Sequence, residues 1–307
     1  MIDLGAQACV WDEKTRPSLI RAGVLGHPIG HSRSPLLHRH WMGRYGVQGS
    51  YEALDTPLED LGSRLNSLRE QGFAGFNVTL PLKEAIIPFC SHLDETARRI
   101  GAVNTVKIER DGSFSGYNTD SFGFIEHLRQ SIPDFAWSGM WVLVLGAGGA
   151  ARGVVDGLLS QGVGHIALVN RGFARAHELR QACADPARVH VYPWRAESGS
   201  ESPFASSSQA HSQETLCDLS PYGLVVNTTS LGMCGQPPLV FSLETLPSRA
   251  VVYDIVYTPL ISDFLQGARA RGHRIVGGLG MLLHQARRRS HLPRQRCRRP
   301  WDRRGGA

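Results

Sequence analysis

The chain has 307 residues, 42% of them hydrophobic and 20% charged, which favours an ordinary globular protein of two domains. No apolar run reaches the roughly 18 residues that cross a bilayer, and residues 1–5 lack the basic and apolar regions of a signal peptide, so we expect a cytoplasmic protein with no membrane partner. Of the net charge of +6, nine arginines and one aspartate after Gln285 contribute +8; the remaining −2 gives no electrostatic case for nucleic acid.

The first part of the chain alternates strand and helix signals. Its predicted elements are strands at 22–25, 73–79, 102–108 and 114–117, and helices at 34–45 and 122–129. Ser34 followed by Pro35 has the pattern of an N-cap and first turn of a helix. Asp111-Gly112 is typical of the turn of a hairpin between the third and fourth strands.

The second part begins with a continuous apolar run, as expected for a central parallel strand. Its predicted elements are strands at 141–145, 166–169, 224–226 and 251–255, and helices at 150–159 and 175–183. This strand–helix rhythm predicts a doubly wound sheet with ligands at the carboxyl ends of its strands. Residues 197–214, rich in Ser and Gln, are expected to form a surface insertion.

Lys83 follows a strand-like run and a proline turn in Phe76-Asn77-Val78-Thr79-Leu80-Pro81-Leu82-Lys83. Proline lacks an N–H and has a fixed φ, so it ends the strand and sets the direction of the next residues. Taken alone, a lysine here is usually a solvated surface residue. A lysine that points into a cleft is instead suited to proton transfer.

A glycine-rich turn follows the apolar strand at 141–145 and precedes a helix. Glycines let the backbone approach a pyrophosphate, and the helix N-terminus favours its negative charge. Because the turn lies between a strand and a helix, this context predicts a dinucleotide site. The candidate residues are Gly146, Ala147, Gly148, Gly149 and Ala150.

The end of the second strand of this unit favours NADP over NAD. NAD-binding proteins usually carry an acid there for the ribose hydroxyls, whereas this chain has Asn170, Arg171 and, one helical turn later, Arg175. Two guanidinium groups can bracket a 2′-phosphate. The alternative, two solvated arginines at a helix start, places cations at the unfavourable end of the helix dipole.

Taken together and in order, these motifs and several others resemble the shikimate dehydrogenase family from about Gly23 to Ala286. The others are residues 26–35 (GHPIGHSRSP), 101–105 (GAVNT), 116–120 (GYNTD), 227–233 (NTTSLGM), 253–257 (YDIVY) and 278–286 (GLGMLLHQA). The chain departs from the family at Gly172, where the family's NADP-binding segment has a threonine.

The resemblance implies an α/β fold with two domains. A substrate domain over residues 1–119, rejoined by 278–290, would accompany a Rossmann-type doubly wound NADP-binding domain over 120–277. It also implies NADP-dependent, reversible reduction of 3-dehydroshikimate to shikimate, a step toward the aromatic amino acids. A homodimer remains compatible with it.

The resemblance assigns roles to individual residues. Lys83 and Asp120 would be the catalytic pair, although Asp120 could equally serve as a helix N-cap. Ser32 and Ser34, with help from Tyr257, would hold the substrate carboxylate. The substrate ring hydroxyls would be bound by Thr79, Asn104 and Gln285, and Ile255 and Gly278 would contact the nicotinamide through their backbone groups.

Two alternatives stay open. A quinate/shikimate dehydrogenase of broader specificity would differ in the region of Ser32 and Ser34. A non-catalytic binding protein on the same fold would not need Lys83 and Asp120. No metal is expected, because the six cysteines are scattered and the four histidines between His27 and His40 lack a partner set of carboxylates or thiols.

The C-terminal residues 291–307 depart from the family. After Ala286 the sequence becomes rich in arginine with almost nothing to bury, so we expect disorder beyond about Ser290 and a short helix around Gln285. The abrupt change of composition is typical of a shifted reading frame. Nucleic-acid binding through this tail is disfavoured, because Trp301 is its only aromatic residue.

Overall fold

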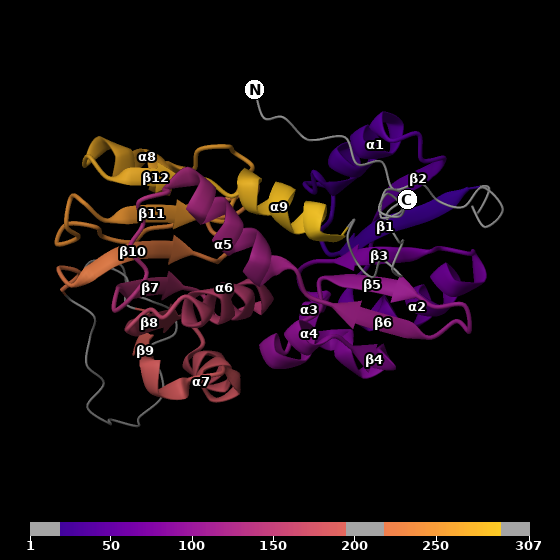
Figure 1. Ribbon diagram of the computed structural model, residues 1–307, viewed down its shortest axis with the longest axis horizontal. Coiled ribbons are helices and arrows are strands. Elements are labelled where there is room, and N and C mark those ends of the chain that lie inside the picture. Colours follow the sequence, from indigo (N-terminus) through magenta and orange to yellow (C-terminus); the bar gives the residue numbers. More distant parts are fainter. Residues whose placement is uncertain (1–18, 195–217, 290–307) are drawn as a thin grey trace, which may run out of the picture.

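The computed structural model describes residues 19–194 and 218–289. The predicted insertion at 197–214 and the tail at 291–307 lie outside these residues. The described chain forms two lobes side by side, each built on a six-stranded sheet (Figure 1). We call these the N-terminal sheet and the C-terminal sheet. The predicted α/β class with two sheet-based units is confirmed.

The N-terminal sheet is mixed, with the strand order β2-β1-β3-β5-β6-β4. β1 lies parallel to β2 and β3, and the predicted hairpin is the antiparallel pair β5 and β6. Its strands are β1 Ile20–Gly26, β2 Gly49–Asp55, β3 Gly75–Val78, β4 His92–Leu93, β5 Thr105–Ile108 and β6 Phe114–Tyr117. Its helices are α1 Ser34–Arg44, α2 Leu61–Glu70, α3 Leu82–Ala85 and α4 Glu95–Ile100, with short 3-10 turns at Leu58–Asp60 and Ile87–Phe89.

The core of this lobe lies between the sheet and α2. Leu61, Leu65 and Leu68 recur at helical spacing and are buried against Phe76 of β3. This packing fixes the carboxyl end of β3, from which Thr79 and Lys83 follow.

The C-terminal sheet is entirely parallel, with the order β12-β11-β10-β7-β8-β9. Its strands are β7 Trp141–Leu145, β8 His165–Asn170, β9 Val189–Pro193, β10 Tyr222–Asn227, β11 Val251–Asp254 and β12 Arg274–Val276. Its helices are α6 Gly149–Ser160, α7 Phe173–Ala182 and α8 Asp263–Ala270, with a 3-10 turn at Pro186–Arg188. The chain runs outward from β7 on both sides, so the strand order reverses between β7 and β10. In doubly wound sheets, ligands bind at that point, beyond the carboxyl ends of the strands.

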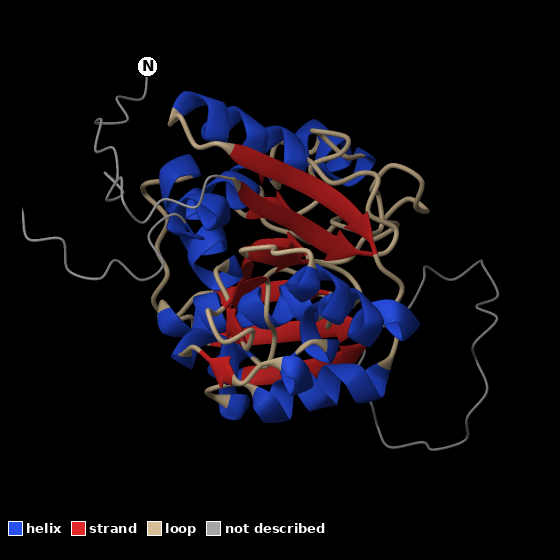
Figure 2. Ribbon diagram, turned by 90° about the vertical axis from the view of Figure 1, so that its right-hand side faces the viewer, coloured by secondary structure: helices blue, strands red, loops and turns tan. Residues whose placement is uncertain are grey.

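Two helices, α5 and α9, lie side by side and connect the lobes. α5 is Asp120–Ser131 and α9 is Leu279–Arg289. Met281 of α9 is buried in the same apolar cluster as Phe124 of α5. Figure 1 shows α9 extending from the C-terminal sheet toward the N-terminal one, and Figure 2 shows helices covering both sheets. α9 thereby carries Gln285 to the junction.

Three local predictions are wrong. Ser34 is the first residue of α1 rather than its N-cap; the N-cap is Arg33, and the backbone N–H of Ser34 donates to the Ser32 hydroxyl at 3.3 Å. Asp120 is likewise the first residue of α5, with Thr119 at the N-cap position. The helix around Gln285 is not short, since α9 has 11 residues.

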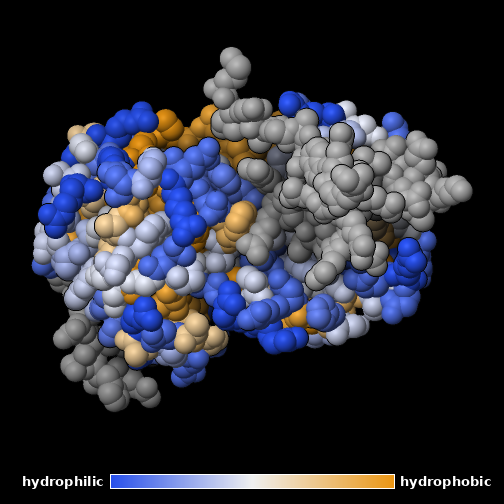
Figure 3. All heavy atoms as spheres, in the orientation of Figure 1, coloured by the Kyte–Doolittle hydropathy of each residue, from blue (hydrophilic) through white to orange (hydrophobic). Residues whose placement is uncertain are grey.

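The described surface is ordinary for a globular protein. Hydrophilic residues make up most of the described surface on the face in Figure 3, with apolar residues showing between them. Within residues 19–194 and 218–289, no helix combines the length and apolar character required to span a bilayer.

His127 of α5 contacts both β11 and α9. Its Nδ1 lies 2.7 Å from the hydroxyl of Tyr253 on β11, and its ring packs directly against Gly280 of α9. Burial, with a smaller contribution from His284, lowers the pKa of His127 to about 4. Protonation of His127 is therefore unfavourable in the folded protein.

This low pKa predicts a loss of stability in mild acid. In the unfolded chain a histidine titrates near pH 6.5, so the unfolded state takes up the proton first as the pH falls. The free energy of unfolding should then drop between about pH 6.5 and about pH 4, by at most about 1.4 kcal/mol per pH unit for one histidine. His127→Gln cannot be protonated, so its melting temperature should fall less than that of the wild type between about pH 7 and about pH 5. Equal pH dependence of the two proteins would contradict this role.

Candidate active site

Lys83 and Asp120 form an ion pair at the junction of the lobes. Lys83 lies in α3, just after β3 and the Pro81 turn, and its Nζ is 2.6 Å from Oδ2 of Asp120 at the start of α5. The side chains are only 13% and 2% exposed. A lysine held by a carboxylate in a nearly dry site can donate a proton to an adjacent oxygen or stabilise negative charge on it. The surface interpretation of Lys83 does not fit this placement.

Asn104 holds the other side of Asp120. Its Nδ2 is 2.6 Å from Oδ1 of Asp120 and 3.3 Å from Oε1 of Gln285. The backbone N–H of Thr119 donates to Oδ1 of Asn104 at 3.1 Å. Asn104 follows the Gly101 turn that ends α4, and it is 1% exposed. Asn104 and Gln285, which are 181 residues apart in the sequence, therefore meet at the ion pair.

Ser32, Ser34 and Tyr257 form a second group. Ser34 is buried. Burial raises the pKa of Tyr257, while hydrogen bonds to the Arg33 backbone and the Ser32 hydroxyl act in the opposite direction. Tyr257 thus lies against the loop before α1, although it comes from the other lobe.

Thr79 lies at the carboxyl end of β3, next to the end of β1. Its backbone N–H donates to Leu25 O at 2.8 Å, and the N–H of His27 donates to Leu80 O at 2.8 Å. A Cβ on Gly26 would be only 2.4 Å from the methyl group of Thr79, so the glycine permits this close approach. The loop carrying Ser32 and the segment carrying Thr79 and Lys83 consequently leave the sheet side by side.

The glycine-rich turn has the geometry that a dinucleotide requires. Gly146 has φ of +105°, and a Cβ there would be 2.8 Å from the Thr228 hydroxyl, so no larger residue fits easily. Gly148 is the N-cap of α6 and provides no side-chain cap, which leaves the first-turn N–H groups for a ligand. Ala147 is buried in this turn, and Gly149 and Ala150 begin the helix.

Helix α6 packs directly on the Lys83–Asp120 ion pair. A Cβ on Gly149 would be 3.0 Å from Cβ of Lys83, and one on Gly153 would be 2.8 Å from Cβ of Asp120. The two glycines are one helical turn apart and face the same side. The end of α6 that favours a pyrophosphate therefore adjoins the ion pair.

Asn170, Arg171 and Arg175 lie where β8 ends and α7 begins. Asn170 Nδ2 donates to Gly172 O at 2.7 Å and so closes the turn. Arg171 is exposed, and its guanidinium has no ion pair within the described parts of the chain. Arg175 instead pairs with Glu84, at 2.7 Å between Nη2 and Oε1. Of the two arginines predicted to bind the phosphate, Arg171 therefore has no ion-pair partner among the described residues, whereas Arg175 is paired with Glu84.

Ile255 and Gly278 meet at the ends of β11 and β12. The N–H of Gly278 donates to Val256 O at 3.1 Å, and a Cβ on Gly278 would be 2.0 Å from Ile255 O. Only glycine allows this contact. The turn at Asn227 supports it, because Asn227 O accepts the N–H of Ile255 at 3.1 Å.

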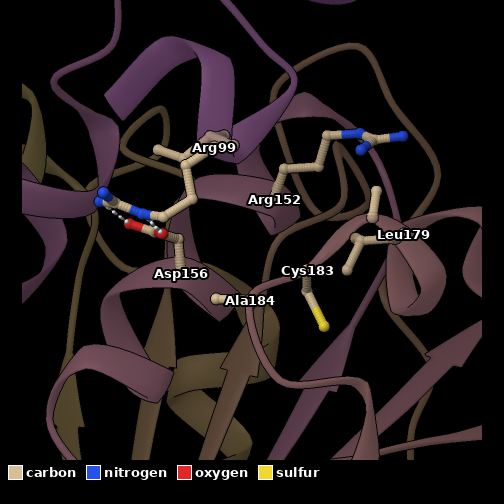
Figure 4. Close-up of a pocket in the computed structure, with 8 residues that line it drawn as sticks. Arg99, Arg152, Asp156, Leu179, Cys183 and Ala184 are labelled. Atoms are coloured by element: carbon tan, nitrogen blue, oxygen red, sulfur yellow. Dashed lines mark hydrogen bonds and ion pairs between the residues drawn. The ribbon is translucent and has the colours of Figure 1, made fainter. Parts of the chain in front are cut away.

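The sequence reasoning missed several charged residues at the junction. Glu84 bridges Arg175 and Arg152, and Arg99 of α4 pairs with the buried Asp156 of α6 at 2.6 Å. Figure 4 shows Arg99 directed onto Asp156 and Arg152 extending away from that pair. Glu84 directly follows Lys83 and Arg152 belongs to the glycine-rich motif, but neither position reveals its partner in the other lobe.

No candidate metal centre accompanies these residues. Across residues 19–194 and 218–289, no group of three or more histidine, cysteine, aspartate or glutamate side chains is placed to hold an ion.

Comparison with known proteins agrees with this arrangement. The profile of the shikimate dehydrogenase substrate-binding domain matches residues 24–106, and that of shikimate / quinate 5-dehydrogenase matches residues 127–193. The NADP(+)-dependent shikimate dehydrogenase of Paramagnetospirillum magneticum is 46% identical over 265 residues, which cover 86% of this chain and 89% of the relative.

Solved structures give the same result. A shikimate 5-dehydrogenase from Thermus thermophilus in complex with NADP(H) and shikimate matches with a TM-score of 0.70 and 36% identity, covering 87% of this chain and 90% of that one. A quinate dehydrogenase from Corynebacterium glutamicum in complex with NAD matches with a TM-score of 0.71 and 27% identity, covering 87% and 90%. The chain belongs to the shikimate dehydrogenase family.

Proposed function

We propose that this protein catalyses the NADP-dependent, reversible reduction of 3-dehydroshikimate to shikimate, a step toward the aromatic amino acids. The observation that carries the proposal is the buried Lys83–Asp120 ion pair, packed against the helix whose glycine turn suits a dinucleotide. The family relationship and the NADP dependence of the relatives support it. The charged pair argues against a protein that only binds its ligands. Burying two charged groups costs free energy, and such groups are typical of catalytic sites.

Lys83 is proposed to complete the reduction as the proton donor. The bound nicotinamide cofactor would supply the hydride for the carbonyl carbon, and the carbonyl oxygen would then carry negative charge. The ammonium of Lys83 stabilises that charge and donates one proton, giving the hydroxyl group of shikimate. Asp120, itself held by Asn104, orients the ammonium and relays the proton to it from water. In the oxidation direction the same groups accept the proton.

The remaining candidates are proposed to position the two reactants. Ser32, Ser34 and Tyr257, grouped before α1, would bind the substrate carboxylate. Hydroxyl and amide groups can both donate and accept, so Thr79, Asn104 and Gln285 suit the ring hydroxyls. The free N–H groups of α6, from Gly148 onward, would hold the pyrophosphate, and the backbone at Ile255 and Gly278 would meet the nicotinamide.

The proposed domain division places the boundary at the start of α5. Residues 1–119 would form the substrate domain and 120–277 the NADP domain, with 278–290 returning to the first. The contact of Gln285 with Asn104 supports the return of this segment to the first lobe, whereas Met281, earlier in α9, packs in the cluster of the second. We also propose a cytoplasmic enzyme that acts on small molecules without nucleic-acid or membrane partners; a homodimer fits the same scheme.

A broader quinate/shikimate activity is the second candidate, because a quinate dehydrogenase shares the fold. Quinate carries an extra hydroxyl on the carbon that bears the carboxylate. Because Ser34 is buried, this hydroxyl would be crowded by the side chains around Ser34. We expect NADP⁺ reduction with shikimate to be at least about tenfold more efficient, in kcat/KM, than with quinate. Initial rates with each substrate offered separately to the full chain decide this. Equal efficiencies would favour the broader enzyme.

A further inference from the structure

Glu84 links the two lobes by binding two arginines at once. It lies in α3, directly after Lys83, and its Oε1 is 2.7 Å from Nη2 of Arg175 in α7. Its Oε2 is 3.3 Å from Nε of Arg152 in α6. One carboxylate from the N-terminal lobe therefore meets two cations of the C-terminal lobe, and one of them is a proposed ligand of the 2′-phosphate.

The two arginines differ in how firmly they hold Glu84. The side chain of Arg152 is 11% exposed, and its Nε makes no regular hydrogen bond within the described chain, so the nearby carboxylate is what compensates its charge. The side chain of Arg175 is 52% exposed and can turn toward solvent or a ligand. Glu84 is thus kept in place by Arg152, whereas its contact with Arg175 is exchangeable.

We infer that Glu84 competes with the 2′-phosphate of the cofactor for Arg175, and that it thereby limits how strongly the enzyme prefers NADP over NAD. The inference rests on the proposed NADP site. A phosphate monoester binds guanidinium groups through charge-assisted hydrogen bonds, as a carboxylate does. Arg171 has no ion pair among the described residues and can receive the phosphate, but Arg175 must exchange one anion for the other. A carboxylate retained beside the phosphate also repels it.

The test compares two probes that differ only in the 2′-phosphate. Binding of 2′,5′-ADP (adenosine 2′,5′-bisphosphate) and of 5′-AMP to the full chain is measured by calorimetry, for the wild type, Glu84→Gln, Arg175→Ala and the double variant. Glu84→Gln should bind 2′,5′-ADP about two- to fivefold more tightly, the range of a partly exposed ion pair, and 5′-AMP with unchanged affinity. In the Arg175→Ala background the same change should alter 2′,5′-ADP binding by less than about 1.5-fold.

Glu84→Gln also removes the carboxylate next to the buried Arg152 and could impair folding. Glu84→Asp keeps a carboxylate there but shortens its reach, so it should weaken the contact with Arg175 and tighten 2′,5′-ADP in the same direction. Its melting temperature should stay near that of the wild type.

The possible results separate the inference from the proposed function. Unchanged or weaker binding of 2′,5′-ADP in both Glu84 variants overturns the competition. Equal tightening of 5′-AMP also overturns it, because the effect would then not involve the 2′-phosphate. If the wild type itself does not distinguish the two probes, the proposed NADP site fails, and the inference fails with it.

Discussion

Replacing Lys83 with alanine should lower kcat by about 10²- to 10⁴-fold, the usual contribution of a general acid–base group, and should change shikimate binding much less. The ammonium acts mainly on charge that develops during hydride transfer, so its loss is felt in the transition state. The variant also leaves Asp120 buried without its cation, so its fold should be checked by circular dichroism. Steady-state rates across shikimate concentrations separate kcat from KM.

Lys107→Ala is the matched control for this change. Lys107 lies on β5 of the same sheet, and its side chain is 50% exposed in a pair with Glu109. Removing it should leave kcat within about twofold of the wild type, as expected for an exposed surface pair. If Lys83→Ala kept more than half of the wild-type kcat, the assignment of Lys83 as the proton donor would be wrong.

Replacing Arg171 with alanine should weaken NADP⁺ far more than NAD⁺. A charge-assisted contact with phosphate is worth about 1.5–3 kcal/mol, or roughly 10- to 150-fold in affinity. Arg171 is the larger contributor, because Arg175 is already paired with Glu84. Dissociation constants for both cofactors, measured on the full chain, test this directly.

Arg180→Ala provides the comparison for Arg171. Arg180 lies on the adjacent helix α7, where its Nε donates to Pro186 O at 3.2 Å, away from the turn after β8. Its removal should affect the two cofactors equally and weakly. An equal loss of NADP⁺ and NAD⁺ binding in Arg171→Ala would contradict a role at the 2′-phosphate.

Most strands of the two sheets could be predicted from local patterns, whereas helices α2, α4 and α8 were not predicted. The apolar run at 141–145 forms the central strand β7, because parallel strands covered on both faces are apolar throughout. The hairpin at β5 and β6 and the helix after the glycine turn follow equally from turn residues and periodicity. Helix starts were less accurate: Ser34 and Asp120 each lie inside the helix, since a residue suited to an N-cap is also stable in the first turn.

The candidate site could be predicted only as separate pieces. Lys83, Asn104, Asp120 and Gln285 were each assigned from ordered motifs, but sequence patterns do not give the distances between them. Contacts between residues far apart in the sequence could not be predicted. Glu84 meets Arg175, 91 residues away, and Arg99 meets Asp156, 57 residues away, through the packing of α3 and α4 on the other lobe. Such pairs depend on the relative placement of whole elements, which local propensity does not encode.

The most direct test of the central claim is the stoichiometry of the reaction in the reducing direction. The full chain is mixed with NADPH and 3-dehydroshikimate, NADPH oxidation is followed by absorbance, and the product is identified by mass spectrometry and chromatography. We expect one shikimate to form for each NADPH consumed, with a much slower reaction when NADH replaces NADPH. Binding of both ligands without turnover would contradict this expectation and would favour a non-catalytic binding protein on this fold.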